Sequence, residues 1–149
     1  ETEILLFTAA RRDHLERLIG PALAEGKIVI CDRFADSTRL YQGLSRGHLR
    51  GIVDQLHNLM IGREPDLTFL IDMHPEPSLQ RALDRQGDEE RFETFGADLQ
   101  RRMRQGFLDL ANEFAGRFRV IDGSHPIKDV AKAVSHVLSD ELQRRNVSS

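Results

Sequence analysis

Short apolar runs rich in β-branched residues recur along the chain and predict the buried strands of a parallel sheet. Three segments have this pattern: Lys27–Cys31, Leu67–Ile71 and Arg119–Ile121. Each run is followed directly by an aspartate. Longer segments between the runs carry apolar residues three or four positions apart, which predicts helices. The alternation of strand and helix is typical of an α/β fold with a parallel sheet.

The helical pattern is clearest in five segments. They are Glu1–Ile19, Leu49–Ile61, Pro75–Arg85, Glu93–Phe114 and Pro126–Leu142. Gly20 and Pro21 are predicted to interrupt the first of them, because glycine and proline both disfavour a helix interior. A polar, charged segment, residues 86–91, connects the third and fourth and has the composition of a mobile surface loop.

Composition narrows the class of protein. The 149 residues predict a single domain, residues 1–149. The net charge of -3 does not favour binding to nucleic acid or to an anionic membrane, so we interpret Arg101, Arg102 and Arg104 as a solvated helix face. No apolar run approaches the roughly 20 residues that span a bilayer. The single cysteine, Cys31, excludes an internal disulfide and favours a reducing, cytoplasmic location.

Candidate chemistry follows the first predicted strand, because ligands of open parallel sheets bind beyond the carboxyl ends of the strands. Arg33 can grip a phosphate through two N–H groups, and Asp32 can hold a water on Mg²⁺. Ser37 and Thr38 begin the next helix, whose N-terminal amides suit an anion. The alternative is a capped helix start with a structural Arg–Asp pair.

Two neighbouring segments bear on that choice. Phe7 and Arg11 lie four residues apart on one helical face, where a ring and a forked donor could receive a nucleobase. The alternative places Phe7 in the core and Arg11 on the solvated surface. Tyr41, the only tyrosine, precedes Gln42 and Gly43. This segment also fits an ordinary helix end with glycine after the last turn.

Taken in order, the segments FTAAR, VICDRFADST, LYQG and PDLTFLID resemble the thymidylate kinase family over Thr2 to about Val137. The resemblance implies a three-layer parallel sheet of the P-loop NTPase type, as in nucleotide kinases. It implies an enzyme that transfers the γ-phosphate of ATP to dTMP, giving dTDP with Mg²⁺ as cofactor. The alternatives are another P-loop deoxynucleoside kinase or a non-catalytic nucleotide-binding remnant.

The resemblance also implies residue roles. It assigns the substrate pocket to Phe7, Arg11, Asp32, Arg33, Ser37, Thr38, Tyr41 and Gln42. Phe7 would stack on thymine while Arg11 reads its carbonyl edge. Arg33 would bind the dTMP phosphate with Asp32 near Mg²⁺, and Tyr41 would lie against the deoxyribose.

A lid is implied at about residues 86–93. Arg81, Arg85 and Arg91 surround it and would bind the ATP phosphates. Arg85 and Arg91, together with Arg33, would act catalytically, because phosphoryl transfer depends on cations around the transferring group. Glu93 could touch Mg²⁺. The loop 123–127 matches the adenine-side loop of the family.

The ATP-site motif GxxxxGK[ST] is absent from this sequence: the sole Gly-Lys pair, Gly26-Lys27, is followed by isoleucine. We therefore expect this chain to be the C-terminal part of such a kinase, with an incomplete sheet. Alone it should be inactive and should not form a stable sheet. The resemblance further implies a homodimer, with Glu1–Ile19 and Leu49–Ile61 as candidate interface helices.

Overall fold

The computed structural model describes residues 2–45, 49–74 and 97–147. The chain divides into two compact units, Glu1–Pro65 and Asp66–Ser149, which are described separately. In the described part of the chain, no helix combines the length and the apolar character that crossing a membrane requires.

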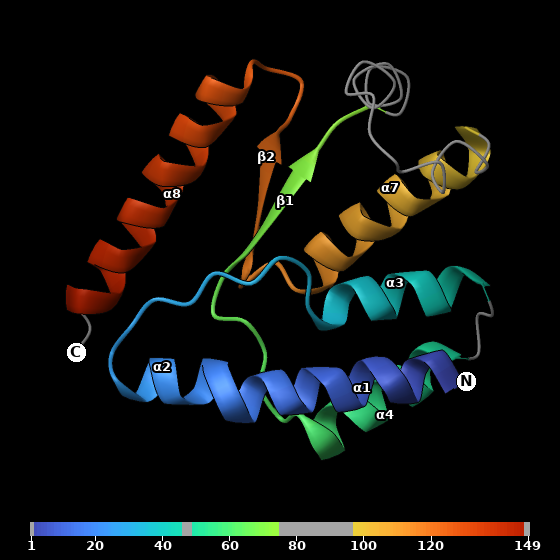
Figure 1. Ribbon diagram of the computed structural model, residues 1–149. Helices are drawn as coiled ribbons and strands as arrows, with labels where there is room; N and C mark the ends of the chain where they lie inside the picture. The colour runs from blue at the N-terminus through green and yellow to red at the C-terminus, as the bar shows by residue number, and fades with distance from the viewer. Residues whose placement is uncertain (1, 46–48, 75–96, 148–149) are drawn as a thin grey trace. The chain divides into compact units, whose positions relative to one another are not determined.

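The first unit is helical (Figure 1). Its elements are α1 (Thr2–His14), the π-helical η1 (Leu15–Ile19), α2 (Gly20–Ala24), α3 (Ala35–Ser45) and α4 (Leu49–Met60). Helices α1, α3 and α4 pack against one another. Ile4 of α1 meets Leu49 and Val53 of α4 in a buried apolar cluster, against which Leu56 also packs. This packing places α1 beside α3, so that Arg11 of α1 can contact residues at the start of α3.

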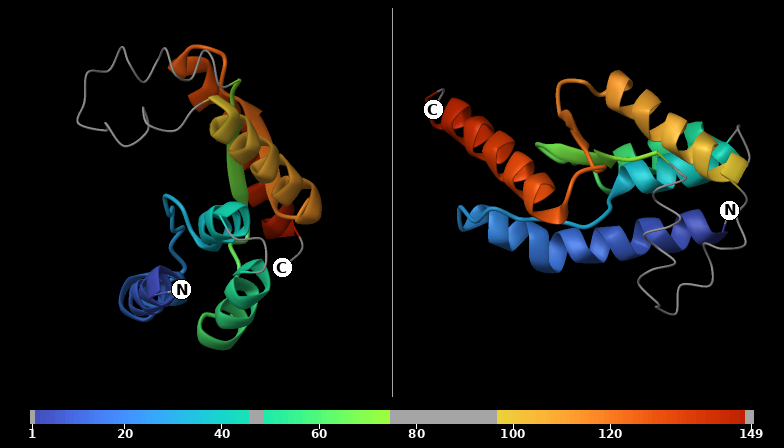
Figure 2. Two further views of the ribbon diagram at one scale, coloured as in Figure 1. Left: turned by 90° about the vertical axis from the view of Figure 1, so that its right-hand side faces the viewer. Right: turned by 90° about the horizontal axis from the view of Figure 1, so that it is seen from above.

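The predicted break at Gly20 and Pro21 is wrong. The helical rod continues from α1 through η1 into α2 (Figures 1 and 2), and Gly20 keeps right-handed helical angles. Its N–H donates to the carbonyl of Leu15, five residues back. This wider turn accommodates Pro21, which has no N–H to donate and would clash with a carbonyl in an ordinary α-helical turn.

The predicted strand Lys27–Cys31 is also wrong. The segment forms no strand, and Ile30 is 87% exposed. A strand exists only when a neighbouring backbone completes its hydrogen bonds, and none of the described residues pairs with this segment. Its β-branched composition therefore records a propensity that no described partner satisfies.

The second unit contains the predicted parallel pairing. Strand β1 (Thr68–Asp72) pairs with β2 (Phe118–Asp122) from Thr68 opposite Phe118 to Asp72 opposite Asp122. Helix α7 (Ala97–Glu113) contacts both strands, and α8 (Ile127–Val147) contacts β2 (Figure 1). The α/β class with a parallel sheet is thereby confirmed for the last two predicted strands.

Some of the remaining fold predictions concern residues that the structure does not describe, and others correspond to observed helices. The predicted helix Pro75–Arg85, the lid at about 86–93 and the start of the helix predicted from Glu93 all lie outside them. The helices predicted at Leu49–Ile61 and Pro126–Leu142 correspond to α4 and α8, and α8 extends to Val147. The single-domain prediction stays a prediction.

Candidate functional site

The turn before α3 presents Asp32 and Arg33 to solvent. Arg33 has a φ of 62°, in the left-handed region that non-glycine residues rarely adopt. Its guanidinium lies 5.9 Å from the ring centroid of Tyr41, and its Nη1 donates to the Tyr41 hydroxyl at 3.5 Å. The Cys31 thiol donates to the carbonyl of Arg33 at 3.3 Å. The structure thus brings together two predicted site residues, Arg33 and Tyr41, through an unusual backbone turn.

Arg11 of α1 reaches across to the start of α3. Its Nη2 donates to Thr38 Oγ1 at 2.8 Å and to the carbonyl of Phe34 at 3.4 Å. Its guanidinium carbon lies 5.2 Å from the centroid of the Phe34 ring, a cation–π distance. Burial, followed by repulsion from Arg39, lowers the pKa of Arg11 from its usual value. Among the described residues, Nη1 and Nε of Arg11 donate no hydrogen bond.

Phe7 lies one turn before Arg11 and is 50% exposed. This is the opposite of the structural alternative considered from the sequence, which placed Phe7 in the core and Arg11 on the solvated surface. An exposed ring beside a tethered guanidinium leaves both groups available to a planar ligand.

The other predicted site residues are less informative. Ser37 and Gln42 are partly buried in α3, and Asp32 is exposed. Arg81, Arg85, Arg91 and Glu93 lie outside the described residues, so their predicted roles stay predictions.

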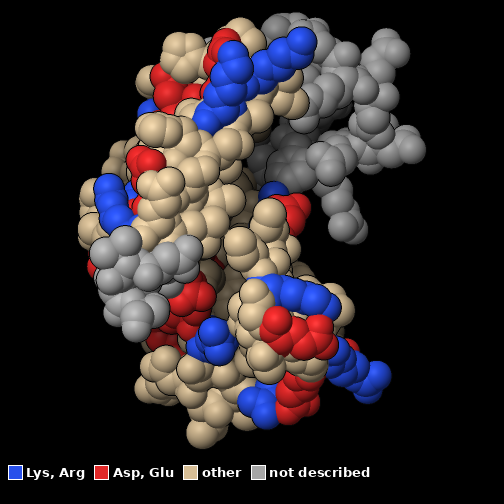
Figure 3. All heavy atoms as spheres, turned by 90° about the vertical axis from the view of Figure 1, so that its left-hand side faces the viewer, with Lys and Arg blue, Asp and Glu red and all other residues tan. Residues whose placement is uncertain are grey.

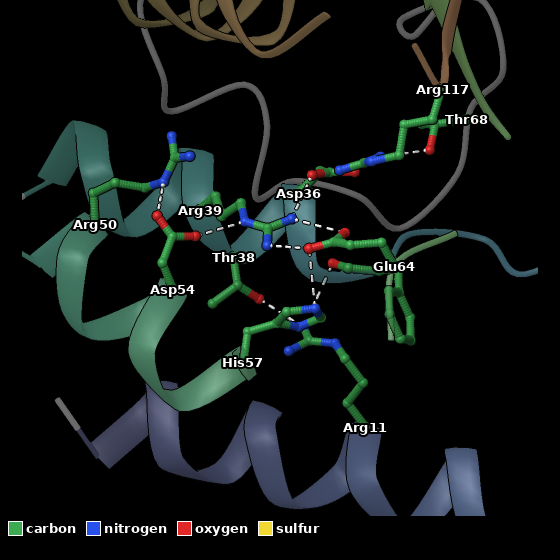
Figure 4. A network of polar contacts seen from close by, with 11 residues as sticks. Arg11, Asp36, Thr38, Arg39, Arg50, Asp54, His57, Glu64, Thr68 and Arg117 are labelled. Atoms are coloured by element: carbon green, nitrogen blue, oxygen red, sulfur yellow. Dashed lines mark hydrogen bonds and ion pairs between the residues drawn. The ribbon is translucent and has the colours of Figure 1, made fainter. Parts of the chain in front are cut away.

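Behind the predicted pocket, Arg39 of α3 is buried among carboxylates (Figure 4). Only 3% of its side chain is exposed. It donates to Asp36 at 2.9 Å, to Asp54 at 2.8 Å and to both carboxylate oxygens of Glu64. Burial alone would lower the pKa of Arg39, but the bonds to Glu64, Asp54 and Asp36 outweigh it and raise that pKa. This charge is therefore fixed within the first unit, and it links α3 to α4 and to the segment after α4.

His57 of α4 lies at the edge of this cluster and is 2% exposed. Its Nε2 lies 3.1 Å from Glu64 Oε1 (Figure 4) but makes no hydrogen bond with any described residue. Its Nδ1 makes no hydrogen bond with any described residue. The imidazole meets the Phe34 ring edge to face, with centroids 6.1 Å apart and an interplanar angle of 89°. A buried polar atom without a partner lowers the free energy of unfolding by about 1–3 kcal/mol, so this histidine destabilises the core.

Glu64 is strongly perturbed by the same contacts. Burial opposes its ionisation, but the interactions with His57 and Arg39 outweigh burial and lower its pKa to about 2. Asp54 in turn accepts a bond from Arg50 at 2.7 Å. Each carboxylate of the cluster thus accepts a hydrogen bond from an arginine, which offsets the cost of burying the Arg39 guanidinium.

Sequence reasoning missed the functional candidates Arg39, Asp54, His57 and Glu64. One signal was present: Leu49, Val53 and His57 recur at four-residue steps and share the buried stripe of α4. A histidine that continues an apolar stripe could have been marked as buried. The partners on α3 and after α4 could not, because their proximity depends on tertiary packing.

In the second unit, the carboxyl ends of the strands carry a separate polar arrangement. Arg104 of α7 donates to both oxygens of Asp72, at 2.7 Å each, and this bond lowers the pKa of Asp72. The amide of Gly123 donates to the carbonyl of Asp72 at 2.7 Å, and the amide of Ser124 donates to Asp122 Oδ1 at 2.8 Å. The loop that follows β2 is therefore anchored to the end of β1.

The surface carries charged side chains of both signs. On the face drawn in Figure 3, acidic and basic side chains are interspersed and form no broad patch of one sign. Within the described ranges, no three histidine, cysteine, aspartate or glutamate side chains are grouped to hold a metal ion.

Comparison with known proteins places these features in context. The family model described as thymidylate kinase matches residues 1–134. The thymidylate kinase of Ruegeria pomeroyi is 69% identical over 97% of this chain and 68% of its own length. That of Dinoroseobacter shibae is 66% identical over 90% of this chain and 65% of its own. The chain thus spans about two thirds of these curated relatives.

A solved structure is also similar to this chain. The crystal structure of thymidylate kinase from Ehrlichia chaffeensis superposes with a TM-score of 0.67 at 36% sequence identity. The match covers 93% of this chain and 64% of that one.

Proposed function

Because the chain belongs to the thymidylate kinase family, we propose that the full-length protein transfers the γ-phosphoryl group of ATP to dTMP. The products are dTDP and ADP. The observation that carries the proposal is the pairing of an exposed Phe7 with a tethered Arg11, together with the exposed Arg33 in the turn before α3.

The dTMP pocket is built from α1 and α3. Phe7 stacks on thymine, and Arg11 donates to the base carbonyl edge through the N–H groups that Thr38 and Phe34 leave unused. Tyr41 lies against the deoxyribose, where its ring also contacts Arg33. Ser37 and Gln42 complete the lining.

Arg33 binds the dTMP phosphate, since an exposed guanidinium can donate two parallel bonds to phosphate oxygens. The left-handed turn supports this role because strained backbone is concentrated at functional sites. Asp32 fits Mg²⁺, which commonly binds one or two carboxylates together with substrate phosphates. Mg²⁺, when bound, neutralises charge on the phosphates during transfer.

The catalytic cations beyond Arg33 are Arg85 and Arg91, with Arg81 also on the ATP side and Glu93 near Mg²⁺. Sequence resemblance supports these roles, since the residues lie outside the described ranges. Transfer needs positioning and positive charge rather than a protein nucleophile, and one arginine of this kind contributes ~10³–10⁵ in rate in related enzymes.

A homodimer in the cytoplasm completes the proposal. Its support is the group of exposed apolar side chains on α1 and α4, namely Leu5, Leu6, Ile52, Leu59 and Met60. Apolar side chains that gather on an exposed surface commonly mark interfaces. The lone, exposed Cys31 fits a reducing compartment.

The deciding experiment is a kinase assay of the full-length protein with ATP and Mg²⁺, using dTMP and thymidine as rival acceptors. We expect ADP and dTDP to form with dTMP and little product with thymidine. Faster turnover of thymidine would identify a deoxynucleoside kinase instead. Calorimetric binding of dTMP without any turnover would identify a non-catalytic nucleotide-binding protein.

A further inference from the structure

A relay of side-chain contacts runs from the Arg39 cluster to Arg11. Glu64 Oε1 lies 3.1 Å from Nε2 of His57, so the carboxylate packs against the imidazole without forming a hydrogen bond. His57 presents its ring to Phe34 at 89°. The Phe34 ring lies under the guanidinium of Arg11, 5.2 Å from its carbon. All four side chains belong to the first unit, and Figure 4 marks the contact between His57 and Glu64 with a dashed line.

Arg11 depends on this support for its orientation. Its only short hydrogen bond goes to Thr38, at 2.8 Å, and the bond to the Phe34 carbonyl is long, at 3.4 Å. A side chain with arginine's rotamer freedom is not fixed by a single bond. The ring of Phe34 supplies a second surface, provided that the ring itself is held.

We propose that His57, oriented by Glu64, is a positioning residue that holds the Phe34 ring against Arg11 and thereby sets the preference for thymine over cytosine. The proposal rests on the proposed function. His57 touches no reacting atom and acts only through Phe34.

The base preference follows from hydrogen-bond chemistry. Thymine carries a carbonyl oxygen at the ring position where cytosine carries an amino group. Guanidinium has only donors, so a fixed Arg11 bonds the carbonyl and meets the amino group with two opposed donors. A loosened Arg11 can withdraw from cytosine, and discrimination then falls because the unfavourable contact is relieved.

The test compares kcat/KM for dTMP and dCMP in the full-length enzyme and three variants. His57→Leu removes the ring edge, His57→Phe restores a ring edge without the imidazole, and Val53→Ala is the control. Val53 is buried in α4, one turn before His57, and belongs to the apolar cluster with Ile4 and Leu49. The substitution Val53→Ala should lower stability without changing any residue of the relay.

We expect His57→Leu to lower the dTMP-to-dCMP ratio roughly 10- to 100-fold, the scale of a misplaced positioning group. The loss should appear as a raised KM for dTMP with kcat little changed. His57→Phe should keep more of the ratio than His57→Leu, because it restores the ring edge against Phe34 but not the contact with Glu64. Glu64→Gln, which frees the imidazole but retains side-chain size, should lose part of the ratio and serves if His57→Leu does not fold.

The outcomes separate the two levels of proposal. A wild-type enzyme that does not prefer dTMP contradicts the proposed function. A wild-type enzyme that prefers dTMP, with His57→Leu keeping the ratio of Val53→Ala, overturns the positioning role alone. Equal losses in His57→Leu and His57→Phe also overturn it, since the ring edge would then not be the operative contact.

Discussion

Arg33 combines a strained backbone with an exposed guanidinium. Its φ of 62° costs a residue with a Cβ about 1–2 kcal/mol relative to glycine. Within the described part of the chain its guanidinium contacts only Tyr41, through the 5.9 Å ring distance and the 3.5 Å bond. A position that glycine would occupy more easily therefore carries the longest cationic side chain, which favours a ligand-binding role.

Two substitutions separate the backbone from the side chain at this position. Both Arg33→Gly and Arg33→Ala remove the guanidinium, so both should weaken dTMP binding, measured by calorimetry of the full-length protein. Only Arg33→Gly relieves the strain. Its free energy of unfolding in urea should exceed that of Arg33→Ala by about 1 kcal/mol. Equal stabilities would show that the turn relaxes, and unchanged affinity would remove Arg33 from the pocket.

At the scale of elements, β1 and the loop after β2 approach each other too closely for any side chain at Gly123. A Cβ there would lie 2.8 Å from Ile71 Cγ2 and 3.1 Å from the carbonyl of Asp72. The amide of Gly123 uses that approach to donate to the same carbonyl. The glycine thus ties the end of β2 to the end of β1 just before α8 begins.

We therefore expect Gly123→Ala to lower the free energy of unfolding by about 1–3 kcal/mol, because the neighbours are a β-branched side chain and a backbone carbonyl. Gly116→Ala is the matched control, since a Cβ at Gly116 meets nothing within 4 Å. That variant should be neutral or more stable by about 0.4–1 kcal/mol. Parallel urea titrations decide, and equal stability of the two variants would contradict the close approach.

At the scale of the whole molecule, the carboxylates paired with arginine make stability depend on pH. The pKa of Glu64 is about 2 in the folded state and 4.5 for an unperturbed glutamate. The unfolded chain therefore binds a proton first as the pH falls. The stabilisation from Glu64 is complete above pH 4.5 and is lost as the pH falls through 2. Asp72, whose pKa is lowered by Arg104, acts in the same direction.

The free energy of unfolding should accordingly decrease as the pH falls from 4.5 to about 2. Glu64→Gln should be less stable than wild type at neutral pH and should change less over that interval, because it has no carboxylate to protonate. Chemical denaturation at several pH values measures both slopes. Identical slopes for variant and wild type would show that Glu64 is not held by Arg39 and His57.

Local pattern alone was enough for part of the structure. Amphipathic spacing predicted α4, α7 and α8, and short β-branched runs predicted β1 and β2. The pair Arg33 and Tyr41 lies within one turn and its following helix, so its contact is nearly local. The ordered motifs also predicted the family that the comparisons confirm.

Tertiary structure decided the rest. The run Lys27–Cys31 forms no strand because strand formation needs a partner, which propensity does not supply. The burial of Arg39 and His57 depends on α3, α4 and Glu64 coming together from positions far apart in the sequence. The sequence by itself determined which segments favour helix or strand and which motifs resemble a kinase, because these are local properties. Only the fold decided which charges are buried and which rings support Arg11, because burial is a property of what packs alongside.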